Sequence, residues 1–544
     1  MKIALAQLNY CIGDFTGNVE KIVAAAEKAK SEGADLVVFS ELSVCGYFPF
    51  DCLCFSDFQE GCRKALDDIA KRCYDIPVLV GCPVPNEEEG QKPLFNAAVY
   101  LYRGERQVFK KKRIGANPLF DERKYFEPSH DEDRLLEVGG LHIAITLGDD
   151  LSNWGQDALL MENRMDELIG LHPDLAVVLA ASAFDYTMPR YRCDTLRQTV
   201  LKHEVPLVMV NQVGAHSHLI FDGGSMAFAS NGHVDTAMPY FEEGVRIVNV
   251  DTLCLFRTSE DRLEIPGKMA LLHDALVLGV RDYFRKMGFK DAVIGLSGGL
   301  DSALVTYFAV KALGAEHVRV VLLPSQFSTD HSVTDAVDLA KKLQVQYDTV
   351  PIKPMYDGFM ASLQPIFQDR PFDVTEENLQ ARIRGVVLMA VSNKFGNVLL
   401  NTSNKSEASV GYGTLYGDMC GGLSVIGDVY KSEAFELARY INKEEEIIPW
   451  HTINKAPSAE LRPDQKDTDS LPDYDVLDKI LFQYIECSKS AEEITAMGFE
   501  EALVRKVIRM VNRNEFKRKQ VAPILRVSPR AFGNERVIPI VAKM

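Results

Sequence analysis

One short segment of the chain combines glycines, hydroxyl side chains and a carboxylate. It consists of Gly295, Leu296, Ser297, Gly298, Gly299, Leu300, Asp301 and Ser302. The apolar run 292–294 before it predicts a buried strand, and residues 303–306 after it begin a helix. Glycines let several backbone N–H groups point at one place, and a helix N-terminus adds partial positive charge there. The segment therefore predicts a phosphate-binding loop in which Asp301 holds a cation that bridges phosphates.

This loop is not a Walker loop, because no Gly-Lys-Ser or Gly-Lys-Thr follows its glycines. It resembles the PP-loop of ATP pyrophosphatases, which split ATP into AMP and pyrophosphate while they adenylate a carboxylate or a carbonyl. A glycine-rich turn without a ligand is the alternative, and a lone Ser-Gly-Gly would not decide between the two. The full string between a strand and a helix favours the nucleotide site.

Further strings in the second half of the chain resemble the NAD synthetase family. They lie at residues 377–382, 401–407, 411–418, 457–465, 467–474, 514–520 and 530–532. The resemblance extends over nearly all of residues 265–544. It implies an enzyme that adenylates the nicotinate carboxylate of deamido-NAD with ATP, after which ammonia displaces AMP to leave the amide.

The same resemblance assigns roles to single residues. The eight residues of the PP-loop and Thr402 are expected to bind ATP. Asp301 and Glu407 are expected to bind magnesium, and Lys405 is a candidate cation for phosphate or transition-state charge. The residues expected to contact deamido-NAD are Asn378, Glu407 and Lys517. Taken alone, Asn404 or Ser406 could merely cap a helix, and Lys517 could belong to a solvated basic face.

The first half of the chain resembles the nitrilase-type amidase domain of glutamine-dependent NAD synthetases. The strings that carry this resemblance lie at residues 39–47, 120–126, 221–225 and 239–243. Such an amidase needs a thiolate to attack glutamine, a carboxylate to move its proton and a lysine to stabilise the oxyanion. The resemblance implies Glu41 as the base and Lys111 as the lysine, although Lys110 or Lys112 would take that place after a one-residue slip.

The position of the thiol carries a glycine. Gly148 follows the predicted strand 143–147, where the family has its cysteine. A hydroxyl would be much harder to deprotonate than a thiol, so no neighbour replaces it. In the glutamine pocket, Asn117 stands for a family tyrosine, and Ser182 is kept within an altered string. We therefore expect an amidase fold with little or no glutamine hydrolysis, and ammonia as the nitrogen donor.

Two α/β domains are needed to position these residues. In the first block, strand-like runs lie at 1–8, 36–39, 78–80, 97–102, 143–147, 176–181, 207–210, 226–229 and 247–250. In the second block they lie at 292–294, 318–323, 347–351 and 398–401, in alternation with helices. We expect a nitrilase-like αββα sandwich at 1–255, a linker at 256–266 and a doubly wound parallel sheet of the PP-loop adenine nucleotide α-hydrolase type at 267–544.

Composition limits the partners of this 544-residue chain. A net charge of −17 argues against nucleic acid or an anionic membrane surface as the main partner. Eleven cysteines without CxxC spacing support neither a disulfide framework nor a zinc site. No signal peptide and no run of 18 apolar residues are seen, so a cytoplasmic location is expected. The family resemblance further implies a homo-oligomer.

Two other functions remain open. One is a PP-loop enzyme that acts on a different carbonyl, such as a nucleotide amidotransferase or a tRNA-modifying enzyme, although the acidic balance counts against tRNA. The other is a non-catalytic assembly or regulatory protein, suggested by the lost thiol. This second alternative requires a lost ATP site as well, whereas the residues of that site are all present.

Overall fold

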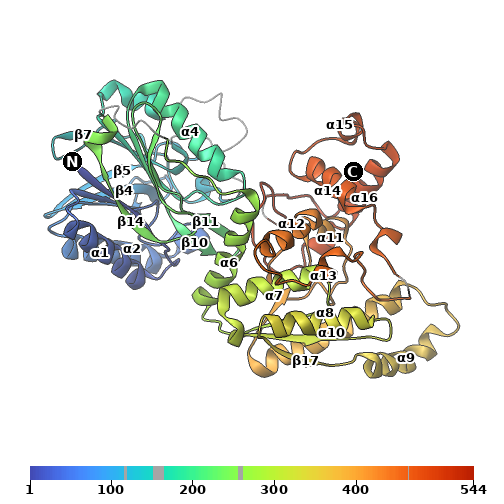
Figure 1. Ribbon diagram of the computed structural model, residues 1–544. Coiled ribbons are helices and arrows are strands. Elements are labelled where there is room, and N and C mark those ends of the chain that lie inside the picture. Colours follow the sequence, from blue (N-terminus) through green and yellow to red (C-terminus); the bar gives the residue numbers. More distant parts are fainter. Residues whose placement is uncertain (116–118, 151–163, 255–260, 464, 534, 544) are drawn as a thin grey trace. The chain divides into compact units, whose positions relative to one another are not determined.

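The computed structural model describes the whole chain except residues 116–118, 151–163, 255–260, 464, 534 and 544. It divides into two compact units, Met1–Pro266 and Gly267–Met544 (Figure 1). Residues 256–260 of the predicted linker lie outside the described residues. At its described end, the Arg262 N–H donates to the Val234 carbonyl oxygen at 3.0 Å, so this end packs on the first unit. Among the described residues, no helix is long and apolar enough to cross a membrane.

The first unit contains two six-stranded sheets. One has the order β14-β1-β2-β3-β4-β5, and the other has the order β13-β12-β9-β8-β7-β6. The strands of the first sheet are β1 Lys2–Gln7, β2 Leu36–Val38, β3 Val78–Pro85, β4 Leu94–Tyr102, β5 Glu105–Lys110 and β14 Gly244–Asn249. The strands of the second are β6 Leu136–Val138, β7 Leu141–Leu147, β8 Leu175–Ala180, β9 Leu207–Asn211, β12 Met226–Phe228 and β13 Val234–Ala237. A separate hairpin joins β10 Val213–His216 to β11 Leu219–Asp222.

Alternation along the strands builds the layers. In β1, Ile3 and Leu5 belong to the core between the two sheets, whereas Ala4 and Ala6 face the helices. Helices α1 Phe15–Ser31 and α2 Ser56–Arg72 cover the first sheet, and α4 Met188–His203 covers the second. Two short helices, α3 Arg164–Leu168 and α5 Val250–Cys254, complete this unit. The order helix, sheet, sheet, helix confirms the expected αββα sandwich.

The second unit is built on a parallel sheet of order β17-β16-β15-β18-β19. Its strands are β15 Ala292–Gly295, β16 Val318–Leu322, β17 Gln346–Thr349, β18 Val398–Asn401 and β19 Leu423–Ser424. Helix α6 Lys268–Met287 precedes the first of these strands, and the helices between the strands are α7 Leu300–Leu313, α8 Asp330–Lys342, α9 Lys353–Phe367, α10 Val374–Phe395 and α11 Lys405–Val410. The chain reverses direction across the sheet between β15 and β18, which is where open α/β sheets bind ligands. The doubly wound sheet is confirmed.

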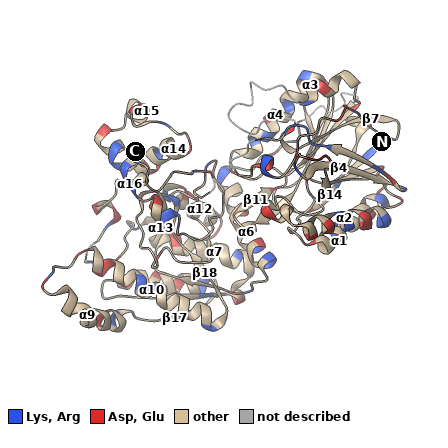
Figure 2. Ribbon diagram, turned by 180° about the vertical axis from the view of Figure 1, so that it is seen from behind, with Lys and Arg blue, Asp and Glu red and all other residues tan. Residues whose placement is uncertain are grey.

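A helical cluster follows this sheet in the chain. It consists of α12 Lys431–Ile441, α13 Trp450–Asn454, α14 Tyr474–Ile485, α15 Ala491–Ala496, α16 Glu501–Arg513 and α17 Glu515–Arg518. Leu477 and Ile480 of α14 pack with Val504 and Val507 of α16 in a separate core. Charges of both signs lie on α1 and α2, and lysines and arginines gather along α16 (Figure 2).

Several short strands were not predicted from the sequence, namely β5, β6, β10, β11, β13 and β19. β5 has the sequence Glu-Arg-Gln-Val-Phe-Lys and lies at a sheet edge, so few of its side chains are apolar. β13 is also an edge strand and has only four residues. Backbone pairing with a neighbouring strand, rather than an apolar pattern, decides such segments.

Candidate functional site

The PP-loop connects β15 to α7 and is held by its own serines. The Ser297 and Ser302 hydroxyl oxygens lie 3.1 Å apart. The Ser297 backbone N–H donates to the Ser302 hydroxyl at 3.2 Å, and the Gly299 N–H donates to the Ser297 hydroxyl at the same distance. Gly299 precedes the first residue of α7, so the loop ends at a helix N-terminus. Donors and helix dipole therefore converge on one place, as a phosphate site requires.

Gly298 allows this loop to pack against a second helix. Its φ is +78°, a left-handed conformation that favours glycine. A methyl group at this position would overlap the backbone carbonyl oxygen of Ser332, which lies in the first turn of α8. Both the backbone angle and the space thus require glycine.

The PP-loop opens into a cavity of about 320 Å³ at the carboxyl ends of the parallel strands. Seven of the eight loop residues line it, all except Gly298, and so do Thr402 and Glu407. Ala336 of α8 and Leu388 of α10 add apolar surface, while Lys431 and Lys455 add cations. The cavity therefore combines phosphate-binding donors with apolar walls, as a nucleotide site needs.

Two carboxylates and one ammonium group meet in this cavity. The Lys431 Nζ forms an ion pair with Asp301 and lies 3.5 Å from Glu407 Oε1. The Asn404 amide donates to Asp301 Oδ1 at 3.3 Å. Burial raises the pKa of Glu407 to about 8, although the Lys431 charge acts in the opposite direction. Burial would lower the pKa of Lys431, but the two carboxylates raise it above its usual range.

Lys431 was missed by the sequence analysis. It is the first residue of α12, where the positive end of the helix dipole disfavours a lysine. A cation in that place signals a nearby anionic group, and this signal was available in the sequence. The structure supplies the anions, since Asp301 and Glu407 come from two other segments of the chain.

Asp301 and Glu407 fit a magnesium ion that also binds phosphate. Among the described residues there is no group of three or more His, Cys, Asp or Glu side chains that could hold a metal alone. Magnesium commonly uses one or two carboxylates together with substrate phosphates. The two carboxylates beside the PP-loop match that donor set.

The expectation for Lys405 is wrong. Its side chain is fully buried and does not line the cavity. The ammonium is held by two carboxylates, at 2.8 Å from Asp428 and 2.5 Å from Glu486. Lys405 is therefore not in a position to reach a phosphate in the cavity, whereas Lys431 and Lys455 line it.

Asn378 and Lys517 both contact the glycine-rich loop 411–418. The Thr414 hydroxyl donates to Asn378 Oδ1 at 2.7 Å. The Lys517 Nζ donates to the carbonyl oxygens of Gly411 and Gly413 at 2.8 and 2.7 Å. Burial lowers the pKa of Lys517, although nearby Asp418 opposes this shift. Neither residue lines the cavity itself, but both contact a loop of which Tyr412, Gly417 and Asp418 do.

In the first unit, Glu41 and Lys111 meet in a buried cluster. The Lys111 Nζ lies 3.0 Å from Glu41 Oε1 and 2.8 Å from Glu122 Oε2. The Asn96 amide donates to Glu41 Oε1 at 2.7 Å. Lys110 and Lys112 point elsewhere and pair with Asp131 and Asp133.

Glu122 and Asn96 were missed by the sequence analysis. Glu122 lies within the string 120–126 that carried the resemblance, so its position was available as a signal. Asn96 lies in β4 and had no distinguishing motif.

Gly148 lies against this cluster at the end of β7. Its φ is +46°, and a methyl group there would overlap Glu41 Oε2. The Glu41 carboxylate therefore lies where the first atom of a side chain at position 148 would begin. Ser182 follows β8, and its backbone N–H donates to Asn211 Oδ1 at 2.9 Å. Asn117 lies outside the described residues.

Comparison with known proteins matches both units. Residues 272–521 match the NAD synthase family, and residues 2–254 match the carbon-nitrogen hydrolase family. The glutamine-dependent NAD(+) synthetase of a Synechocystis strain is 44% identical to this chain. The alignment covers 99% of this chain and 98% of the relative. The chain belongs to the glutamine-dependent NAD⁺ synthetase family. The corresponding protein of Acinetobacter baylyi is 41% identical over 99% of this chain and 98% of its own length.

Solved structures of the NAD⁺ synthetase family agree with this assignment. The enzyme of Acinetobacter baumannii, solved with adenosine diphosphate, is 38% identical and has a TM-score of 0.78, with 99% of this chain and 98% of that chain covered. The Cytophaga hutchinsonii enzyme has a TM-score of 0.84 at 21% identity, over 100% of this chain and 98% of that chain, and shows the fold alone. The family assignment confirms that the chain is a ligase that forms carbon–nitrogen bonds.

Gly298 provides a test of the cavity. We expect Gly298→Ala to lower kcat/KM for ATP by about 100-fold or more, because a one-ångström displacement of a binding group can cost that much. Gly288→Ala is the matched control, since Gly288 has a φ of +73° but open space around its Cβ position. Both variants carry about 1–3 kcal/mol of backbone strain. Steady-state kinetics and urea unfolding of the two proteins would distinguish strain from overlap, and equal kinetic effects would contradict the assignment.

Proposed function

We propose that the chain converts deamido-NAD to NAD⁺ with ATP and ammonia, and releases AMP and pyrophosphate. One observation carries this proposal. The synthetase unit keeps a nucleotide cavity built around the PP-loop, whereas the amidase-like unit has Gly148 where the family places its nucleophile. The synthetase unit therefore has the groups for adenylation, whereas the amidase-like unit has no nucleophile at position 148 to release ammonia from glutamine.

The PP-loop and the charges around it perform the adenylation. The nicotinate carboxylate attacks the α-phosphorus of ATP, the bond to the bridging oxygen breaks, and pyrophosphate leaves with the electron pair. The backbone N–H groups of the loop, with Ser297 and Ser302, hold the phosphates, and Thr402 contacts the nucleotide. The Lys431 ammonium neutralises charge that develops on the leaving pyrophosphate. Asp301 and Glu407 would hold a magnesium ion, which would supply further neutralisation of the phosphate charge.

The amidation follows at the carbonyl carbon of the adenylate. Ammonia attacks this carbon, loses a proton and expels AMP with the electron pair of the broken bond. Asn378 and Lys517 hold the loop 411–418 in place, and together with Glu407 they form the deamido-NAD side of the site. Their hydrogen bonds to Thr414, Gly411 and Gly413 support this role.

The amidase-like unit retains the partners of a nucleophile without the nucleophile. Glu41 and Lys111 keep their buried contact, and Glu122 adds a second carboxylate to the ammonium. Glu41 and Glu122 are both paired with the Lys111 ammonium, so none of these groups stands as a nucleophile in the place of the thiolate. Glycine at position 148 therefore leaves this unit without glutamine hydrolysis, and free ammonia must enter the synthetase site.

We also propose that the protein acts in the cytoplasm. All eleven cysteines are free thiols, as expected in a reducing compartment.

A nitrogen-donor assay tests the proposed function. Ammonia-free enzyme would receive deamido-NAD, ATP and magnesium with either ammonium or glutamine, and NAD⁺ and pyrophosphate would be measured. We expect turnover with ammonium and a glutamine rate below about 1% of it, because no nucleophile is present. Glutamine turnover close to the ammonium rate would overturn the loss of hydrolysis. Pyrophosphate release that does not depend on deamido-NAD would contradict the assignment of deamido-NAD as the substrate.

Restoring the thiol tests the remaining groups of the amidase-like unit. We expect Gly148→Cys to gain slow glutamine-dependent NAD⁺ formation, because Glu41 and Lys111 are already placed to activate a thiol and hold an oxyanion. The Glu41 carboxylate must first rotate away from the new side chain. Gly148→Ser is the matched control and should stay inactive with glutamine, since a hydroxyl resists deprotonation. A folded Gly148→Cys protein without any glutamine-dependent activity would show that the pocket no longer binds glutamine.

We further propose that synthetase units pair through α9 and α10. Phe359 and Ile366 of α9 are exposed, as are Val386 and Met389 of α10. Other residues of α10, among them Arg384, line the nucleotide cavity. Apolar side chains exposed together on two neighbouring helices are typical of a protein–protein interface. A second copy of the chain is the expected occupant and accounts for the homo-oligomer implied by the family resemblance.

A single charge tests this pairing. Val386→Glu should convert the oligomer to a smaller species, because a buried unpaired carboxylate strongly disfavours an interface. Arg509→Glu on the exposed face of α16 is the control for an altered surface charge. Sedimentation equilibrium of both variants gives the answer. An unchanged mass for Val386→Glu would contradict the assignment of this surface.

A further inference from the structure

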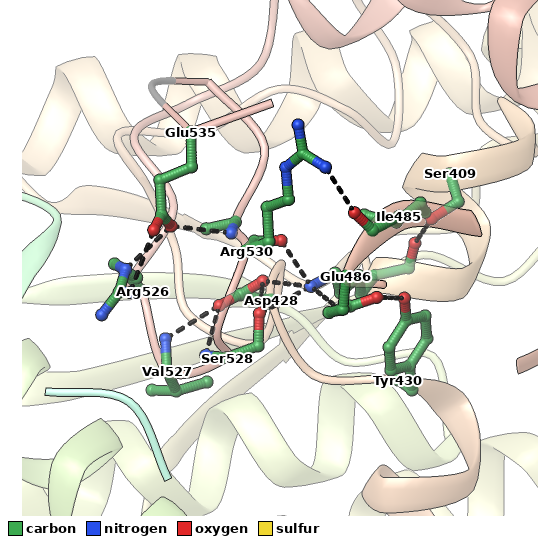
Figure 3. Close-up of polar contacts among 12 residues, drawn as sticks. Ser409, Asp428, Tyr430, Ile485, Glu486, Arg526, Val527, Ser528, Arg530 and Glu535 are labelled. Atoms are coloured by element: carbon green, nitrogen blue, oxygen red, sulfur yellow. Dashed lines mark hydrogen bonds and ion pairs between the residues drawn. The ribbon is translucent and has the colours of Figure 1, made fainter. Parts of the chain in front are cut away.

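A buried group of charges lies outside the nucleotide cavity, at the N-terminal end of α11. Asp428, Glu486 and Ser528 converge on one ammonium nitrogen, the Nζ of Lys405. Figure 3 labels these three acceptors. The distances from Nζ are 2.8 Å to Asp428, 2.5 Å to Glu486 and 2.6 Å to the Ser528 hydroxyl. The Arg530 carbonyl oxygen accepts a fourth contact at 3.0 Å.

These acceptors come from three separate parts of the second unit. Asp428 precedes α12, Glu486 follows α14, and Ser528 belongs to the C-terminal segment. Asp428 also accepts from the backbone N–H groups of Val527 and Ser528 at 2.8 and 2.7 Å. One ammonium group therefore ties α11 to the start of α12, the end of α14 and the C-terminal segment, as Figure 3 shows for the labelled partners.

Charge balance makes this connection specific for a cation. The side chains of Lys405 and Asp428 are fully buried, and that of Glu486 is nearly so. Burial would lower the pKa of Lys405, but the carboxylates of Asp428 and Glu486 raise it above its usual range. Tyr430 donates its hydroxyl to the second oxygen of Glu486 at 2.8 Å. An apolar side chain in place of Lys405 would leave two buried carboxylates without a counter-charge.

The connected segments carry the charges of the nucleotide cavity. Lys405 and Glu407 lie on the same short helix, whose N-cap Asn404 also binds Asp301. Lys431 lies three residues after Asp428. The Lys405 N–H donates to the Val429 carbonyl oxygen at 2.8 Å, which joins the two backbones directly.

A side-chain contact joins the same two segments a second time. The Lys431 N–H donates to the Ser406 hydroxyl at 2.8 Å. The positions of Glu407 and Lys431 therefore depend on the two segments that the Lys405 ammonium holds together.

We propose that Lys405 is a positioning residue for adenylation. Its ammonium sets the spacing between Glu407 and Lys431, and it makes the C-terminal segment around Ser528 part of the nucleotide site. The inference rests on the proposed roles of Glu407 and Lys431 at the nucleotide. It assigns a function to a lysine that contacts neither the cavity nor a substrate.

Two substitutions of different severity test the proposal. Lys405→Met removes the ammonium and keeps the length of the side chain, and Ser528→Ala removes a single partner. Glu535→Gln is the matched control, because it weakens the buried Arg526–Glu535 pair, at 2.8 Å, in the same C-terminal segment. Glu535 makes no described contact with α11 or with residues 428–431. Urea unfolding would measure the stability of each protein, and kinetics would be recorded below the unfolding range with ammonium as the donor.

The kinetic constants and the stability of the variants together distinguish a positioning role of Lys405 from a purely structural one. Lys405→Met should lower kcat/KM for ATP by about 100-fold and Ser528→Ala by about 5–10-fold, because loss of alignment acts on the transition state. The KM for deamido-NAD should change less than the KM for ATP. Glu535→Gln should lose stability and keep both KM values within about twofold.

A direct binding measurement keeps the test decisive if Lys405→Met does not fold or if the wild-type enzyme forms no NAD⁺. If Lys405→Met does not fold, Ser528→Ala still decides the question. Binding of ADP with magnesium, measured by calorimetry, should weaken in Ser528→Ala and not in Glu535→Gln, whether or not the wild type forms NAD⁺. Wild-type enzyme that forms no NAD⁺ would refute the proposed function alone. Unchanged ATP kinetics and ADP binding in folded Lys405→Met and Ser528→Ala would overturn the positioning role, and so would an equal effect of Glu535→Gln.

Discussion

Burial of charge in the synthetase unit is the constraint on which the site depends. Asp301 and Glu407 lie close to each other beside the PP-loop, and the Lys431 ammonium compensates both. Beneath them, Lys405 compensates Asp428 and Glu486 in a second, fully enclosed cluster. An unpaired charge in either cluster would strongly destabilise the fold, because its desolvation would not be compensated. Pairing them therefore determines how α11, α12 and the C-terminal segment meet, and with it the shape of the cavity.

The PP-loop depends on packing as much as on its own sequence. Gly298 lets the loop approach the first turn of α8 so closely that no side chain fits between them. The loop then presents its donors at the point where the parallel sheet reverses its strand order. Thr402, which follows β18, the strand next to β15, lines the same cavity. The backbone N–H groups of the loop provide the phosphate-binding donors. The charge of Asp301 is compensated by Lys431, which lies far away in the chain.

In the first unit, a buried cluster of charges is held together beside a glycine at position 148. Glu41, Lys111 and Glu122 remain in contact because each satisfies the buried charge of another. This mutual compensation of charge stabilises the cluster with a glycine at position 148. Retained neighbours are consequently weak evidence for retained hydrolysis.

The sequence by itself determined the α/β class, the phosphate loop and the family, because these depend on local patterns. The full string at residues 295–302, between a strand and a helix, suffices to predict a PP-loop, and longer strings of residues suffice for a family resemblance. Which lysine serves the nucleotide was decided only by the tertiary structure. Lys405 and Lys431 are similar in sequence context, but one faces buried carboxylates and the other faces the cavity. The physical reason is that compensation of charge depends on which distant segments pack together, and no local pattern records that.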